Sequence, residues 1–73
     1  MITDKTLCAL IEVYTELAVE LKANGTPIDQ IKLLIEDVKK NLENSTVQGL
    51  SFEQKVLLDK LIDESISRVE HSA

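Results

Sequence analysis

Apolar residues recur every three or four positions along three stretches of the chain, and this spacing places them on one side of an α-helix. In the first stretch they are Leu7, Leu10, Ile11, Tyr14, Leu17, Ala18 and Leu21. In the second they are Ile28, Ile31, Leu34, Ile35, Val38 and Leu42, with Leu33 on the opposite side. In the third, from Ser51 to Val69, they cover a wider arc. The pattern predicts helices over about residues 4–24, 27–43 and 52–69.

Residues that start and stop helices separate these stretches. Thr3 is placed to cap the first helix, and Asn24-Gly25 to end it, because glycine readily adopts the left-handed conformation that follows many helices. Thr26-Pro27 then starts the second helix at once, with proline at its first position. Ser51 and Gln54 match a capping box at the start of the third. The first two helices should therefore form a tight hairpin.

The third helix has more apolar surface than a small bundle needs. At about 100° per residue, one arc faces the core and contains Leu57, Leu58, Leu61, Ser65 and Val69. A second arc beside it contains Phe52, Val56 and Ile66, with Lys55 and Asp59 among them and Ile62 at the border. We expect Phe52, Lys55, Val56, Asp59 and Ile66 to contact a partner. Replacing Phe52 or Ile66 by Asp should then weaken association without unfolding the monomer.

The predicted fold class is all-α, an antiparallel three-helix bundle that forms a single domain over residues 1–73. A chain of 73 residues lies near the lower limit of what folds without disulfides or metals. Tyr14 and Phe52 are its only aromatic residues, so the core must consist of Leu, Ile and Val. The surplus arc of the third helix could be buried in a symmetric homodimer, and this alternative stays open beside a foreign partner.

The charge of the chain argues against a nucleic-acid partner. The net charge is −5, whereas a phosphate backbone attracts clusters of Lys and Arg. Glu12, Glu16 and Glu20 follow one another at four-residue intervals, either as a solvated face or as an acidic strip that docks a cationic partner. The apolar run from Leu7 to Ile11 is too short for a signal-peptide core or a membrane span. We expect a cytoplasmic protein.

Catalytic and cofactor motifs are not found in the sequence. A structural zinc site needs about four ligands, but the chain has one histidine, His71, and one cysteine, Cys8, at opposite ends. We expect His71 to lie in a tail that frays from Val69 onward, where it could not hold a nucleophile in place. Cys8 is expected to be a small apolar residue at the edge of the core. The predictions are therefore no enzyme, no metal and no cofactor.

From Leu21 onward the chain resembles the C-terminal part of the enterocin-type (pediocin-like) bacteriocin immunity proteins. The residues that carry the resemblance are Leu21-Lys-Ala-Asn-Gly-Thr-Pro-Ile28, Gly49-Leu50-Ser51-Phe-Glu-Gln54, Leu57-Leu58, Leu61-Ile62 and Ser65-Ile66-Ser67-Arg68. It implies a small cytoplasmic helical bundle that protects the producer of a cationic antimicrobial peptide, through contact with the peptide or with its receptor, a membrane permease. The family's bundles have four helices, and this sequence predicts three.

The predicted function is a non-enzymatic protein-binding module, with bacteriocin immunity as the leading hypothesis. The first alternative is a small phage- or plasmid-type regulator that binds and inhibits another protein. The second is a DNA-binding repressor, with the third helix as its recognition helix. This one is disfavoured, because the acidic residues of that helix outnumber Lys55, Lys60 and Arg68.

Overall fold

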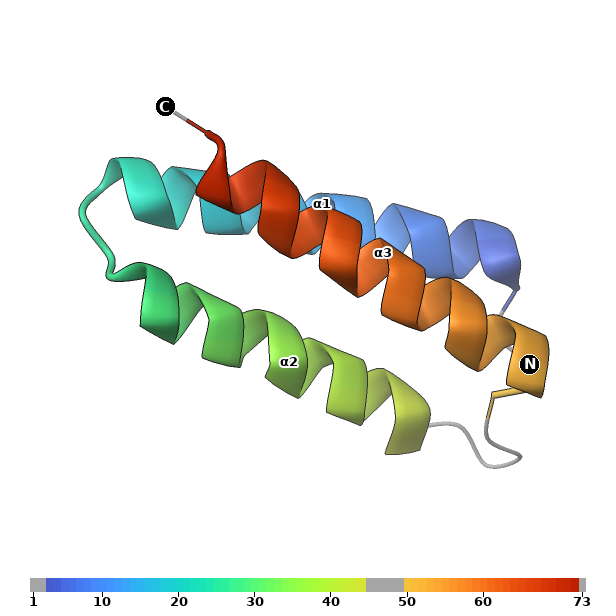
Figure 1. Ribbon diagram of the computed structural model, residues 1–73. Coiled ribbons are helices and arrows are strands. Elements are labelled where there is room, and N and C mark those ends of the chain that lie inside the picture. Colours follow the sequence, from blue (N-terminus) through green and yellow to red (C-terminus); the bar gives the residue numbers. More distant parts are fainter. Residues whose placement is uncertain (1–2, 45–49, 73) are drawn as a thin grey trace.

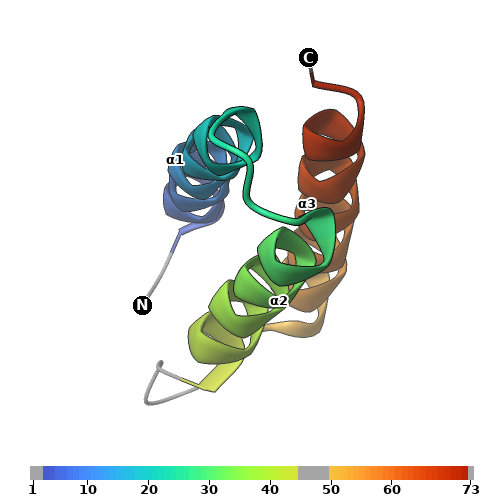
Figure 2. The ribbon, with the colours of Figure 1, turned by 90° about the vertical axis from the view of Figure 1, so that its left-hand side faces the viewer.

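The computed structural model describes residues 3–44 and 50–72, which form three α-helices (Figure 1). They are α1 (Asp4–Ala23), α2 (Ile28–Asn44) and α3 (Phe52–Glu70). Helices α1 and α3 run in the same direction and α2 runs opposite to both. The view along the bundle in Figure 2 shows α1 and α3 on either side with α2 beneath them. Every pair of helices is in contact, which confirms the predicted all-α three-helix bundle.

The helix ends follow the local capping chemistry that the sequence predicts. Thr3 accepts a hydrogen bond from the Thr6 backbone N–H at 3.1 Å. The Ser51 hydroxyl accepts from the Gln54 N–H at 3.1 Å, and the Gln54 side-chain oxygen accepts from the Ser51 N–H at 3.2 Å. These bonds satisfy N–H groups that the first turn of a helix leaves without partners. The capping box at the start of α3 is confirmed.

The turn between α1 and α2 is a Schellman motif. Gly25 has φ +96°, in the left-handed region, and its N–H donates to the Lys22 carbonyl at 3.0 Å. The N–H of Thr26 donates to the Leu21 carbonyl, also at 3.0 Å. Helix α2 begins at Ile28, one residue later than predicted, because Pro27 is the residue whose carbonyl accepts the first helical bond. The turn itself is therefore closed by backbone hydrogen bonds.

The apolar side chains of the core are all aliphatic. Those that are buried are Leu7, Ile11, Ala18, Ile31, Ile35, Val38, Leu50, Leu58, Ile62 and Val69. Both aromatic side chains lie outside this set, with Phe52 81% exposed and Tyr14 37% exposed. Ile62, which the sequence places at the border of the two arcs of α3, belongs to the core.

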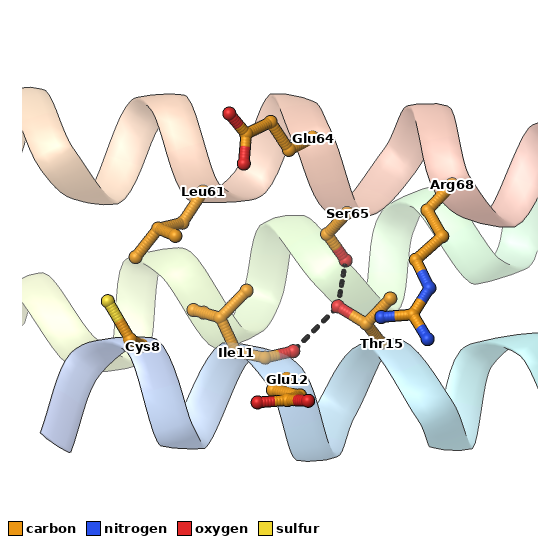
Figure 3. A pocket seen from close by; sticks show the side chains of 8 residues that line it. All are labelled: Cys8, Ile11, Glu12, Thr15, Leu61, Glu64, Ser65 and Arg68. Atoms are coloured by element: carbon orange, nitrogen blue, oxygen red, sulfur yellow. Dashed lines mark hydrogen bonds between the residues drawn. The ribbon is translucent and has the colours of Figure 1, made fainter. Parts of the chain in front are cut away.

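Helix α1 is turned about its axis relative to the prediction. Its buried residues are Leu7, Ile11, Thr15 and Ala18. Tyr14 and Leu17, which the apolar spacing assigns to the core, are exposed. Thr15 is buried instead and makes a polar contact with α3: its hydroxyl donates to the Ile11 carbonyl at 2.6 Å and lies 2.6 Å from the Ser65 hydroxyl (Figure 3). Two small hydroxyl residues thus meet at the contact between α1 and α3.

The last turn of α3 is held by a lysine from α1. The Lys22 ammonium donates to the carbonyl oxygens of Val69, Glu70 and Ser72 at 3.0, 2.9 and 2.8 Å. A cation is favourable there, because the last carbonyls of a helix carry its negative dipole end. Val69 is fully buried and α3 continues to Glu70, so the expected fraying from Val69 onward is wrong for the residues that the structure describes.

Candidate partner-binding surface

Four of the five residues predicted to contact a partner lie together on the N-terminal half of α3. Phe52 and Val56 are exposed, Val56 by 54%, and Lys55 and Asp59 beside them are exposed as well. At about 100° per residue, all four fall on the side of the helix that borders α2. We call this group, Phe52, Lys55, Val56 and Asp59, the α3 surface. It places two large apolar side chains in water, flanked by one charge of each sign.

Asp59 also ties the α3 surface to α2. Its carboxylate oxygen lies 2.6 Å from the Lys39 ammonium nitrogen. The hydrogen bond to Asp59 raises the pKa of Lys39 above its ordinary value of 10.5; burial opposes this shift, while the charges of Asp59, Glu43 and Asp63 add to it. The ion pair thus links the α3 surface to α2.

Ile66, the fifth predicted residue, is placed differently. Its side chain is half-buried and packs against the core cluster. It lies two to three turns further along α3 than Val56 and Asp59. Ile66 therefore contributes to the fold, and we leave it out of the α3 surface.

A second group of exposed apolar side chains lies where α1 borders α2. Tyr14 and Leu17 project from α1, Leu17 with 45% exposure, and Leu34 projects from α2 with 37% exposure. Leu17 stands six residues before the end of α1 and Leu34 six residues after the start of α2, so the hairpin places them at the same level. We call Tyr14, Leu17 and Leu34 the α1–α2 strip. The sequence assigns all three to the core, and the structure corrects this.

The contacts with α3 establish which way the strip faces. On α2, Lys32 and Lys39 approach Glu70 and Asp59 of α3. Leu34 lies on the other flank of the buried face of α2, away from Lys32 and Lys39, and so borders α1. The corresponding flank of α1 away from α3 carries Tyr14 and Leu17. The α1–α2 strip thus lies between α1 and α2, on the side of the bundle that α3 does not cover.

A groove of about 270 Å³ runs between α1 and α3 (Figure 3). Its lining residues are Cys8, Ile11, Glu12, Thr15, Leu61, Glu64, Ser65 and Arg68. The two hydroxyls on its floor, Thr15 and Ser65, are hydrogen-bonded to each other. Cys8 at its border is exposed. Within residues 3–44 and 50–72, no three His, Cys, Asp or Glu side chains come together as a metal site.

None of the three helices, over the residues described, is both long and apolar enough to cross a membrane. Comparison of the chain with protein-family models, with curated proteins and with solved structures finds no match.

Proposed function

We propose that this chain is a non-enzymatic protein-binding module that acts as a bacteriocin immunity protein. The observation that carries the proposal is the exposure of Phe52 and Val56 on the α3 surface. Large apolar side chains that stay together in water mark sites of interaction with other macromolecules. Aromatic residues in particular concentrate binding energy at protein interfaces. Contact through the α3 surface would be the mechanism, with no chemical step.

The immunity function rests on the resemblance of residues 21–68 to the enterocin-type immunity proteins. Phe52 stands within one of the segments that carry this resemblance, Gly49 to Gln54, and is also the most exposed of the large apolar side chains described. The partner would be the antimicrobial peptide or its receptor permease. A net charge of −5 favours encounter with a cationic peptide. Protection would take place in the cytoplasm of the producer cell.

The proposal is tested by expressing the chain in a strain that is sensitive to pediocin-like peptides. We expect survival to increase against at least one peptide of a panel. Phe52→Asp should abolish protection, because it places a charge at the centre of the contact. Leu33→Asp is the matched control, since Leu33 is 60% exposed on another face of the bundle and should tolerate the same change.

Two results would contradict the proposal. Unchanged killing by every peptide, with the protein present and folded, would exclude immunity as the function. Full protection by Phe52→Asp would show that the α3 surface is not the contact. Circular dichroism of each purified variant separates a lost contact from a lost fold.

A further inference from the structure

We propose that the α1–α2 strip binds an amphipathic helix of another protein, one whose polar face is cationic. This inference concerns Tyr14, Leu17 and Leu34, and so it is independent of the α3 surface and of the immunity function. Val13, on the outer side of α1, is also exposed and extends the apolar area by one residue. Val13, Tyr14 and Leu17 follow the three- and four-residue spacing by which one helix contacts another.

The groups that border the strip are acidic. Glu20 follows Leu17 by three positions on α1, and Asp37 follows Leu34 by three positions on α2. Residues three apart are neighbours on a helix surface, so an exposed carboxylate stands next to each leucine on its solvent side. Within the described residues, neither carboxylate takes part in an ion pair. A helix lying on the strip would meet apolar contacts in the middle and a negative charge on both sides.

The basic residues of the hairpin are directed elsewhere. Lys22 caps α3, while Lys32 and Lys39 approach carboxylates of α3. Lys5 and Lys40 lie toward the end of the hairpin that is remote from the turn. Arg68 comes nearest from α3, where it lines a hollow of about 540 Å³ together with Glu20. Arg68 shares this hollow with Glu20 but forms no ion pair with it in the part of the chain that the structure describes, and none of these basic residues pairs with Asp37.

The same charges disfavour a second copy of the chain as the occupant. A symmetric dimer places one surface against itself, so both copies would bring Glu20 and Asp37 to one interface. Like charges that face each other across an interface oppose association. A cationic amphipathic helix instead pairs its Lys or Arg residues with these carboxylates and buries its apolar face on the leucines. This occupant satisfies both features of the strip.

Tyr14 provides a direct measurement. It is the only tyrosine of the chain, which contains no tryptophan, and it lies within the strip. The probe is a synthetic helical peptide built from Leu and Lys, without Tyr or Trp, and the control is the same peptide with Glu in place of Lys. We expect the Leu/Lys peptide to change the fluorescence of Tyr14 saturably, more weakly as salt is added, and the Leu/Glu peptide to leave it unchanged.

Two pairs of variants locate the binding. Leu17→Asp should weaken the affinity for the Leu/Lys peptide about tenfold or more, and Leu33→Asp should leave it unchanged. The double reversal Glu20→Lys with Asp37→Lys should weaken binding by about tenfold, whereas Glu36→Lys with Glu53→Lys alters the net charge equally and should have a much smaller effect. The Phe52→Asp variant should bind the Leu/Lys peptide with unchanged affinity, so a failure of this inference can be distinguished from a failure of the α3 surface.

Three results would overturn the inference. One is equal binding of the Leu/Glu peptide, because the acidic border would then play no part. Another is an equal effect of Leu17→Asp and Leu33→Asp, which would place the peptide elsewhere. The third is a change of Tyr14 fluorescence with protein concentration alone that Leu17→Asp abolishes, because a second copy would then cover the strip.

Discussion

Helix α1 makes two very different contacts, one with α3 and one with α2. Toward α3 it contributes a buried hydroxyl pair, Thr15 with Ser65, and the ammonium group of Lys22 on the last carbonyls of the partner helix. Toward α2, its neighbour in sequence, it leaves Tyr14 and Leu17 exposed. The helix that is distant in sequence is thus the one that α1 contacts with specific polar groups.

The difference follows from how each pair is held together. The Schellman turn keeps α1 and α2 close, because a short connection costs little entropy to close. The contact between α1 and α3 has no such covalent constraint and depends on side chains that specify position and orientation. An interface maintained by the chain itself can leave apolar surface free, and in this molecule that free surface is the α1–α2 strip.

The largest predicted effect contrasts two leucines of α1, one buried and one exposed. Leu7 is fully buried, and Leu7→Ala should lower the free energy of unfolding by about 2–4 kcal/mol. Leu17→Ala removes the same atoms from a half-exposed side chain and should cost less than about 1 kcal/mol. Urea denaturation followed by circular dichroism measures both. Equal losses would mean that the strip belongs to the core and that the comparison between the two contacts fails.

The next contrast tests the two ends of the predicted contact arc on α3. Ile66 packs against the core, so Ile66→Asp should lower the free energy of unfolding by about 2 kcal/mol. The sequence predicts instead that this variant leaves the monomer folded. Phe52→Asp should change stability by less than about 0.5 kcal/mol, because Phe52 is exposed and an acidic residue suits the first turn of a helix. Thermal unfolding of both variants decides this. A stable Ile66→Asp protein would return Ile66 to the α3 surface.

Much of the fold could be predicted because it depends on neighbouring residues. Thr3, Gly25 and Ser51 act on backbone groups a few positions away, so the helices begin and end within one residue of the predicted limits. The exposure of Phe52 and Val56 could be anticipated from the width of the apolar arc on α3. The spacing of apolar residues along a helix shows how wide an arc they cover, and the arc on α3 is wider than a small bundle needs.

The orientation of each helix could not be predicted, because it depends on residues far apart in the chain. The spacing on α1 fits a core face through Tyr14 and Leu17 as well as one through Thr15, and the partner of Thr15, the Ser65 hydroxyl, lies 50 residues away on α3. Lys22 and Lys39 likewise have no local signal for their partners on α3. The apolar spacing therefore assigns Tyr14, Leu17 and Leu34 to the core, whereas the structure exposes them.

The cap of α3 by Lys22 should contribute less than a core leucine. Lys22→Met keeps most of the apolar stem but removes the ammonium group that donates to the Val69, Glu70 and Ser72 carbonyls. The Val69 carbonyl keeps the Ser72 N–H and hydroxyl as donors. We expect a loss of about 1–2 kcal/mol and faster hydrogen exchange in the last turn of α3. Lys60→Met is the control, because Lys60 is exposed in the middle of that helix. Equal exchange in the two variants would show that the last turn does not depend on α1.

The smallest predicted effect is the ion pair between Lys39 and Asp59. As a surface pair it should contribute about 0.2–1 kcal/mol at neutral pH. Because folding raises the pKa of Lys39, this contribution is complete below the ordinary value of 10.5 and is lost as the pH rises through the higher pKa of the folded state. Asp59→Asn should therefore be less stable than the parent at neutral pH, and the difference should vanish in strongly alkaline solution. A difference that persists there would mean that Asp59 stabilises the bundle by a route other than the charge of Lys39.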